Sequence, residues 1–321
     1  MKKVSILVPI YGVEQYISKC AQTLFEQSYP NIEYVFVNDC TKDKSMSILK
    51  DVIKRYPERS EMVKIIDHET NQGLGGARST AIRNATGDYI IHVDSDDFLA
   101  LNAVEALILK AEKTGADIVD GGYYDFHTNN SLLESHTPPH IDSLKYIKIL
   151  VSRVGLTSNQ IWGRLIKRNL YLEKSAINVP GIDFAEDYSV LPILLDGTKR
   201  VWIDDCIYYY RNDNTSSYMH HMSQKNIISC IKAHDLVYDY FKASKINKEV
   251  SFFIDYGMLN LLAFCKKNGF QLLESKYYRP IDLDSFLLRF YAITLRSNIM
   301  LVFSSTVNIL IKKIYVESLL K

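Results

Sequence analysis

The sequence predicts an α/β protein in which helices cover both faces of a mostly parallel sheet. Two observations predict this fold class. Short apolar strands alternate with amphipathic helices through the first third of the chain, a pattern typical of parallel sheets. Polar residues also follow three of these strands directly. They would lie at the carboxyl edge of the sheet, where ligands bind in this fold class.

The predicted elements follow one another closely in the first hundred residues. Strands are predicted at residues 4–8, 33–37, 63–66 and 89–93, and helices at 14–27, 46–53 and 77–85. Pro9 is expected to end the first strand. The glycines at 73–76 are expected to precede the third helix, and Gly87 to end it as a C-cap.

The alternation weakens after Asp117. We predict strands at 117–120 and 201–210, loops at 128–141 and 180–187, helices at 143–153, 160–174 and 188–195, and only helices beyond residue 223. This change indicates a helical region appended to the sheet.

The composition is that of a folded globular protein with balanced charge. Hydrophobic residues make up 47% of the 321 residues and charged residues 23%, which excludes a disordered chain. Lys and Arg number 38 against 37 acidic residues, giving a net charge of +1. This balance gives no indication of a nucleic-acid partner.

The cysteines and the amino terminus both point to the cytoplasm. The five cysteines are scattered without Cys-x-x-Cys spacing, so we expect reduced thiols and neither a zinc site nor a redox pair. The apolar run after Lys3 is too short for the hydrophobic core of a secretory signal.

Three carboxylates stand within four residues where the fourth predicted strand ends, at Asp94, Asp96 and Asp97. Such charges repel one another and are costly to bury unless a cation is present. Mg²⁺ takes one or two carboxylates together with substrate phosphates. Side chains two apart on an extended strand end point alike, so we predict a cation site at Asp94 and Asp96. We expect Asp97 to cap the following helix, and a solvated acidic turn is the alternative for the group.

Asp39 closes the second predicted strand, where a carboxylate can accept hydrogen bonds from the base or ribose of a nucleotide. Taken alone, a helix cap at Asp39 or Asp43 explains this position better. The glycines at 73–76 do not complete a dinucleotide fingerprint, because Arg78 stands where a small residue is required. No P-loop motif occurs. The alternative that a phosphate binds near the start of the following helix is left open.

Four segments resemble the opening of the family 2 glycosyltransferases in order and spacing. They are Val-Ser-Ile-Leu-Val-Pro-Ile-Tyr at 4–11, Val-Asn-Asp-Cys-Thr-Lys-Asp at 37–43, Asn-Gln-Gly-Leu-Gly-Gly-Ala-Arg at 71–78 and Gly-Asp-Tyr-Ile-Ile-His-Val-Asp-Ser-Asp-Asp at 87–97. Ile-Trp-Gly-Arg-Leu at 161–165 and Phe-Ala-Glu-Asp at 184–187 resemble later segments, so the resemblance covers residues 1–215.

The resemblance implies an inverting, metal-dependent glycosyltransferase with a GT-A fold, whose sheet is Rossmann-like and mostly parallel. We then expect a catalytic domain at 1–220, with a nucleotide-sugar half at 1–105 and an acceptor half at 106–220. Residues 221–321 would form a helical C-terminal region. The expected partners are a nucleotide-sugar donor, commonly a UDP-sugar, and a saccharide or lipid-linked saccharide acceptor in surface polysaccharide synthesis.

On the nucleoside side, the resemblance implies that Pro9 and Tyr11 line the pocket and that Asp39 accepts from the base, commonly uracil. Two residues on this side depart from the family's usual pattern. Gly12 replaces a frequent asparagine, and Cys40 replaces a frequent aspartate or glycine.

On the reaction side, the resemblance implies that Asp94 and Asp96 form the Asp-x-Asp metal motif. Asp96 would be the more direct ligand of a Mn²⁺ or Mg²⁺ ion on the donor diphosphate. Glu186 and Asp187 would supply the catalytic base, with Asp187 preferred, and Arg78 would contact the donor. The cation would stabilise the leaving diphosphate, and the base would take the proton of the acceptor hydroxyl. The start of a capped helix explains Glu186 and Asp187 as well.

The carboxy-terminal segment at 286–316 is apolar with interspersed arginines and lysines. Its longest uncharged stretch, 297–311, is too short to span a bilayer. Peripheral contact with an anionic membrane, on the inner face of the plasma membrane, explains this pattern. Core packing or homodimer formation explains it equally well.

Two other functions compete with the glycosyltransferase. A sugar nucleotidyltransferase would carry a glycine-rich loop with an arginine directly after the first strand, and residues 9–14 lack it. A non-catalytic nucleotide- or carbohydrate-binding relative would have no physical reason to keep the costly carboxylates Asp39, Asp94, Asp96 and Asp187.

Overall fold

The computed structural model describes residues 1–126, 134–155, 159–212, 222–270, 287–289, 291 and 301–320. The strands are β1 (Val4–Ile10), β2 (Ile32–Asn38), β3 (Val63–Asp67), β4 (Tyr89–His92), β5 (Phe98–Leu99), β6 (Ile118–Phe126), β7 (Glu134–His136), β8 (Arg164–Lys167) and β9 (Arg200–Arg211). The helices of the first 220 residues are α1 (Ile17–Phe25), α2 (Ser45–Ile53), α3 (Pro57–Ser60), α4 (Gly73–Asn84), α5 (Ala103–Thr114), α6 (Ser143–Val151), α7 (Arg168–Glu173) and α8 (Glu186–Leu195).

The strands form one sheet in the order β3-β2-β1-β4-β8-β6-β9-β5, and β7 pairs with the free part of β6. The first four strands are parallel throughout, in the order typical of a Rossmann-like half. In the second half β8 runs antiparallel to β4 and β6, whereas β6 and β9 are parallel. The predicted α/β fold class is confirmed.

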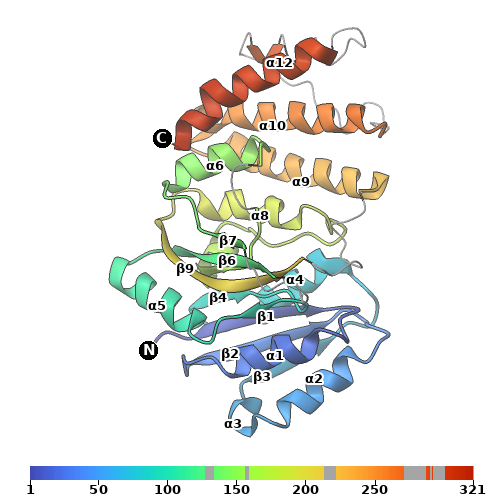
Figure 1. Ribbon diagram of the computed structural model, residues 1–321, viewed down its shortest axis with the longest axis vertical. Helices are drawn as coiled ribbons and strands as arrows, with labels where there is room; N and C mark the ends of the chain where they lie inside the picture. The colour runs from blue at the N-terminus through green and yellow to red at the C-terminus, as the bar shows by residue number, and fades with distance from the viewer. Residues whose placement is uncertain are drawn as a thin grey trace.

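Strand β1 lies between β2 and β4 in the sheet, and all seven of its residues are buried. Its alternate side chains Val4, Ile6, Val8 and Ile10 join a core cluster with α1, α2 and α5. Leu7 points to the other face and joins a second cluster with α4, α6 and α8. Helices therefore cover both faces of the sheet, as Figure 1 shows. Strands buried on both faces need continuous apolar runs, which is the pattern in the sequence.

Strand β1 continues through Pro9, which the sequence analysis expected to end it. The carbonyl of Leu7 accepts from Val93 on the β4 side. Alternate residues of a parallel strand bond to the same neighbour, so the nitrogen of Pro9 also faces that side. Strand β4 ends at His92, so the N–H that Pro9 lacks is not needed for the ladder.

The predicted helix at 160–174 is wrong in its first half. Residues Arg164–Lys167 form β8, and Ile166 pairs with both Ile90 and Ile118. Leu165 and Ile166 are buried in the two different clusters on opposite faces of the sheet. Their apolar spacing is therefore that of a strand. Only the remainder forms a short helix, α7.

Two smaller predictions also need correction. The loop predicted at 128–141 contains the strand β7, although residues 127–133 lie outside the described part. The glycines at 73–76 form the first turn of α4 and do not precede it, and the helix ends at Asn84 before Ala85. A Cβ at Gly75 would come within 2.6 Å of the carbonyl oxygen of Ile182. The helix can therefore approach the 179–182 segment only with glycine there.

Helices follow the sheet, as predicted beyond residue 223. They are α9 (Gln224–Ala243), α10 (Asn247–Lys267) and α12 (Leu301–Ile311), followed by a π-helical segment, η3 (Lys312–Val316), and a 3₁₀ segment, η4 (Glu317–Leu320). Figure 1 shows α9, α10 and α12 in successive layers above α8. Residues 286, 290 and 292–300 of the basic segment at 286–316 lie outside the described residues.

None of the helices described here is both long and apolar enough to cross a membrane. The five cysteines are all free, in agreement with the predicted reduced thiols.

Candidate active site

The polar residues that follow the parallel strands meet at one edge of the sheet. Ile10 pairs with Asn38, and Leu7 pairs with His92. Asp39 directly follows β2 and Asp94 lies two residues beyond β4, so the two flank the end of β1. The chain switches sides here, because β2 and β3 lie on one side of β1 and β4 on the other. Such a switch point forms the ligand crevice in open α/β sheets.

A cavity of about 1230 Å³ opens at this edge. It exceeds the roughly 300–1,000 Å³ of a typical small-molecule site, so it has room for two substrates together. All eight residues predicted from the sequence to bind or react line this one cavity: Pro9, Tyr11, Asp39, Arg78, Asp94, Asp96, Glu186 and Asp187. Their separate roles stay predictions.

The turn after β4 alternates in burial. Asp94 and Asp96 are partly exposed and line the cavity, whereas Asp97 is buried. Asp97 does not cap a helix, contrary to the prediction, because it precedes β5. Its carboxylate accepts from the hydroxyl of Tyr208 and the backbone N–H of Arg211, both at 2.7 Å. Burial, with the nearby charges of Asp96 and Asp94, raises the pKa of Asp97 well above its usual range. Strand β9 thus fixes the turn that presents Asp94 and Asp96.

Arg78 connects this turn to the predicted base. Its side chain is 1% exposed, and it pairs with Asp94 at 2.8 Å, with Glu186 at 2.8 Å and with Asp187. Burial alone would lower the pKa of Arg78, but these carboxylates raise it above its ordinary value. Arg78 is therefore a permanent cation that holds two distant segments of the chain together.

Glu186 and Asp187 form the first turn of α8, so the helix starts two residues before the predicted 188, and the N-cap is Ala185, with no side-chain cap. Their side chains are 11% and 14% exposed. Burial raises the pKa of both carboxyls. The charge of Asp187 raises the pKa of Glu186 further, whereas the charge of Arg78 acts to lower the pKa of both. One oxygen of Asp187 accepts from the backbone N–H of Ile161 at 3.1 Å. Both carboxylates thus have fixed positions in the cavity wall.

Asp39 fixes the start of α4. Its carboxylate accepts from the backbone N–H groups of Gln72 and Gly73, each at 2.8 Å, and from the ring of His68 at 2.7 Å. The side chain is 4% exposed and still lines the cavity. Asp39 therefore does cap a helix, but that helix is α4 and not the α2 that follows it in sequence.

One wall of the cavity is aromatic. The ring of Trp162 stacks on Tyr208 at 4.3 Å and on Tyr210 at 5.4 Å, and Tyr123 meets it edge to face. Tyr208 is fully buried. Trp162, Tyr210 and Tyr123 line the cavity, and this wall was not predicted from the sequence. Its residues come from three strands or adjoining loops, so no local motif could have indicated it.

A second buried ion network, also missed, supports the same region. Asp120 on β6 pairs with Arg164 of β8, its partner in the sheet register, and with Arg200 of β9. Arg164 also donates to the hydroxyl of Tyr146 at 2.7 Å. Burial raises the pKa of Asp120, but the two arginines outweigh it, so the pKa is lowered overall. The network joins three strands, β6, β8 and β9, within the acceptor half predicted from the sequence.

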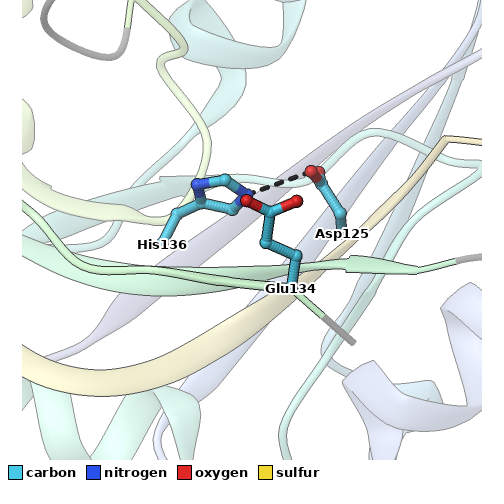
Figure 2. A group of neighbouring side chains, drawn as sticks. All are labelled: Asp125, Glu134 and His136. Carbon is cyan, nitrogen blue, oxygen red and sulfur yellow. Dashed lines mark hydrogen bonds and ion pairs between the residues drawn. The ribbon is translucent and has the colours of Figure 1, made fainter. Parts of the chain in front are cut away.

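A third group of polar side chains lies on the β6–β7 pair, where Asp125, Glu134 and His136 converge (Figure 2). Asp125 and Glu134 are direct cross-strand partners, and like charges in such pairs repel. His136 pairs with Asp125 at 3.0 Å and stacks on Tyr123. The group contains none of the predicted metal ligands, and the His136–Asp125 pair accounts for its geometry.

Comparison with known proteins identifies the family. Residues 5–174, more than half of the chain, match the family Glycosyl transferase family 2. The chain belongs to glycosyl transferase family 2.

Among the curated members of this family, the chain is 30% identical over 218 residues to glycosyltransferase GlyA of Streptococcus pneumoniae. That match covers 65% of this chain and 30% of GlyA. It is also 30% identical over 225 residues to EpsJ of Bacillus subtilis, an uncharacterized glycosyltransferase, covering 66% of this chain and 62% of EpsJ. The chain thus spans less than two thirds of the length of both relatives.

The fold agrees with that of a solved structure. The crystal structure of S. aureus TarS 1-349 in complex with UDP-GlcNAc superposes with a TM-score of 0.68 at 17% identity. The match covers 98% of this chain and 91% of the TarS chain. At this identity the likeness shows the fold, and the predicted GT-A fold is confirmed.

The family match includes only part of the site. It covers Pro9, Asp39, Arg78, Asp94 and Asp96 but ends at residue 174. Glu186 and Asp187 lie beyond it, and in the structure the three ion pairs of Arg78 join them to the family segment.

Proposed function

We propose that the chain transfers a sugar from a nucleoside diphosphate sugar, a UDP-sugar, to a hydroxyl group with inversion at the anomeric carbon. The acceptor is a saccharide or lipid-linked saccharide of a surface polysaccharide. The observation that carries this proposal is the single cavity shared by Asp39, Asp94, Asp96 and Asp187. Family membership supports it, as does the UDP-GlcNAc bound to TarS.

Asp94 and Asp96 suit a divalent cation, Mn²⁺ or Mg²⁺. They are partly exposed carboxylates two residues apart on the cavity wall. Oxygen ligands in this number fit hard cations that also bind substrate phosphates. When bound, such a cation would neutralise charge on the diphosphate leaving group.

In this proposal Asp187 takes the proton of the acceptor hydroxyl. Burial raises the pKa of its carboxyl above the usual range, which makes it a stronger base once ionised. Its bonds to Arg78 and to the N–H of Ile161 fix its direction. Because the incoming hydroxyl attacks in a single displacement, the configuration inverts.

The test is the Asp187→Asn variant, which keeps the shape of the side chain but removes the base. We expect UDP release from a UDP-sugar donor to fall roughly 10²–10⁴-fold, while the affinity for UDP measured by calorimetry stays within a few-fold of the wild-type value. Unchanged turnover in a folded variant would remove Asp187 from the mechanism.

A further inference from the structure

His68 lies behind the cavity, directly after β3, and its side chain is 6% exposed. It does not line the cavity. Its backbone N–H donates to the carbonyl of Asn38 at 2.9 Å, so the end of β2 fixes its position. Its ring contacts Asp39 on one side and Thr80 of α4 on the other, at 2.7 Å and 2.8 Å.

The chemistry of the partners sets the directions of these two bonds. An ionised carboxylate can only accept, so Nδ1 of His68 carries a hydrogen and donates to Oδ1 of Asp39. A hydroxyl can donate or accept, so Thr80 can satisfy Nε2 in either protonation state of the ring. The pair Thr80–His68 thus holds Asp39 whether or not the ring is charged.

Counting acceptors on Asp39 then distinguishes its two oxygens. Oδ1 accepts from both the N–H of Gln72 and Nδ1 of His68, which uses its two lone pairs. Within the described part of the chain, Oδ2 accepts one hydrogen bond, from the N–H of Gly73. The oxygen with remaining acceptor capacity is therefore Oδ2, on a carboxylate that lines the cavity.

We infer that His68 is a positioning residue for nucleobase recognition. It occupies Oδ1 and fixes the rotation of the Asp39 carboxylate, which leaves Oδ2 to accept a hydrogen bond from the base, the N3–H of uracil. Without His68 the carboxylate would be held by the backbone N–H groups of Gln72 and Gly73 alone, and its orientation towards the base would be less firmly fixed. This inference rests on the proposed function, because it requires a nucleotide in the cavity.

Two conservative variants separate the two bonds of the histidine ring. The amide of His68→Asn can replace Nδ1 as donor to Asp39 but does not reach Thr80. The amide of His68→Gln can reach Thr80 but leaves Asp39 without its donor. His68→Ala removes both bonds. The Asn and Gln variants are matched controls, since both keep a polar side chain at the same site.

The measurement is the affinity of each variant for UDP and for 3-methyluridine 5′-diphosphate, by calorimetry. The methyl group removes the N3 hydrogen, and its bulk contributes similarly in every variant. Wild type and His68→Asn should bind UDP about tenfold or more tightly than the methylated compound, as expected for a hydrogen bond to a charged group. In His68→Ala and His68→Gln this ratio should fall several-fold.

The other outcomes overturn the inference. A variant that weakens both ligands equally, with the ratio unchanged, would show that His68 only supports the fold. An unchanged affinity and ratio in all variants would remove His68 from recognition, while binding of UDP would leave the proposed function standing. No binding of UDP to the wild type would defeat the proposed function itself. If His68→Ala does not fold, the comparison of Asn with Gln decides.

Discussion

Arg78 is the residue on which the charge balance of the cavity depends. It is 1% exposed and lies between Asp94 of the predicted metal motif and the carboxylates Glu186 and Asp187. Removing one partner of a buried ion pair leaves an uncompensated charge, which costs about 3–5 kcal/mol. We therefore expect Arg78→Gln to lower the free energy of unfolding by about this amount, measured by urea denaturation.

The matched control is Arg83→Gln, on the same helix but exposed. Exposed substitutions of this kind usually change stability by no more than about 0.5 kcal/mol. Equal stability of the two variants would mean that the three ion pairs of Arg78 do not hold the cavity together.

At this scale, the sequence predicted what depends on local geometry. Asp94 and Asp96 line the cavity together because alternate residues of an extended chain point alike. The contact between His68 and Asp39 joins residues 29 apart, and no spacing rule indicates it. Arg78 was expected to contact the donor. Its three ion pairs could not be foreseen, because Glu186 is 108 residues away.

At the scale of elements, Glu33 joins β2 to the start of β1 and to the turn before β4. Its carboxylate pairs with Lys3 at 2.6 Å and accepts from the N–H of Thr86 at 2.6 Å. Burial would raise the pKa of Glu33, but the bonds from Lys3, Ser5 and Thr86 lower it to about 2. This group therefore ties three segments at the edge of the sheet opposite the cavity.

The lowered pKa of Glu33 predicts a loss of stability in acid. Its folded-state pKa lies below the unfolded value, so its contribution is complete above pH 4.5 and is lost as the pH falls towards 2. At about 1.36 kcal/mol per pKa unit the contribution is roughly 3 kcal/mol. We expect the difference in unfolding free energy between wild type and Glu33→Gln to shrink across this range. A difference independent of pH would contradict the assignment.

The sequence predicted most parallel strands well, because each is a continuous apolar run. Strand β8 was missed, because Leu165 and Ile166 lie in a short segment between polar residues and their apolar spacing fits a helix as well as a strand. The segment forms a strand because it lies between β4 and β6, where Ile166 pairs with both strands. Such a tertiary effect cannot be read from a short segment.

At the scale of the whole molecule, the C-terminal helices share one core with the sheet. Val237 and Phe241 of α9 and Ile254 of α10 belong to the same cluster as Leu7 of β1. A Cβ at Gly257 of α10 would meet the carbonyl of Val151 at the end of α6. The domain division at residue 220 stays a prediction. Within the described residues, one hydrophobic core contains side chains from both sides of it.

The shared core predicts that damage to α10 destabilises the sheet. Gly257→Ala should lower the free energy of unfolding by about 1–3 kcal/mol, as overpacking does. Both tryptophans, Trp162 and Trp202, lie before residue 220, so their fluorescence reports on the catalytic part. We expect fluorescence and helical circular dichroism to shift together in one transition. Lys248→Ala, an exposed change on the same helix, is the control. A fluorescence transition unaffected by Gly257→Ala would show an independent helical domain.

The central claim is that Asp94 and Asp96 hold a cation that this chain needs to release UDP from a UDP-sugar. The most direct test measures UDP release across a panel of donors with Mn²⁺, Mg²⁺ or EDTA. The proteins compared are the wild type, Asp96→Ala and the exposed control Asp51→Ala. We predict turnover that requires the cation, is abolished by EDTA and by Asp96→Ala, and is unchanged in Asp51→Ala. Turnover that persists in EDTA and in folded Asp96→Ala would contradict the claim.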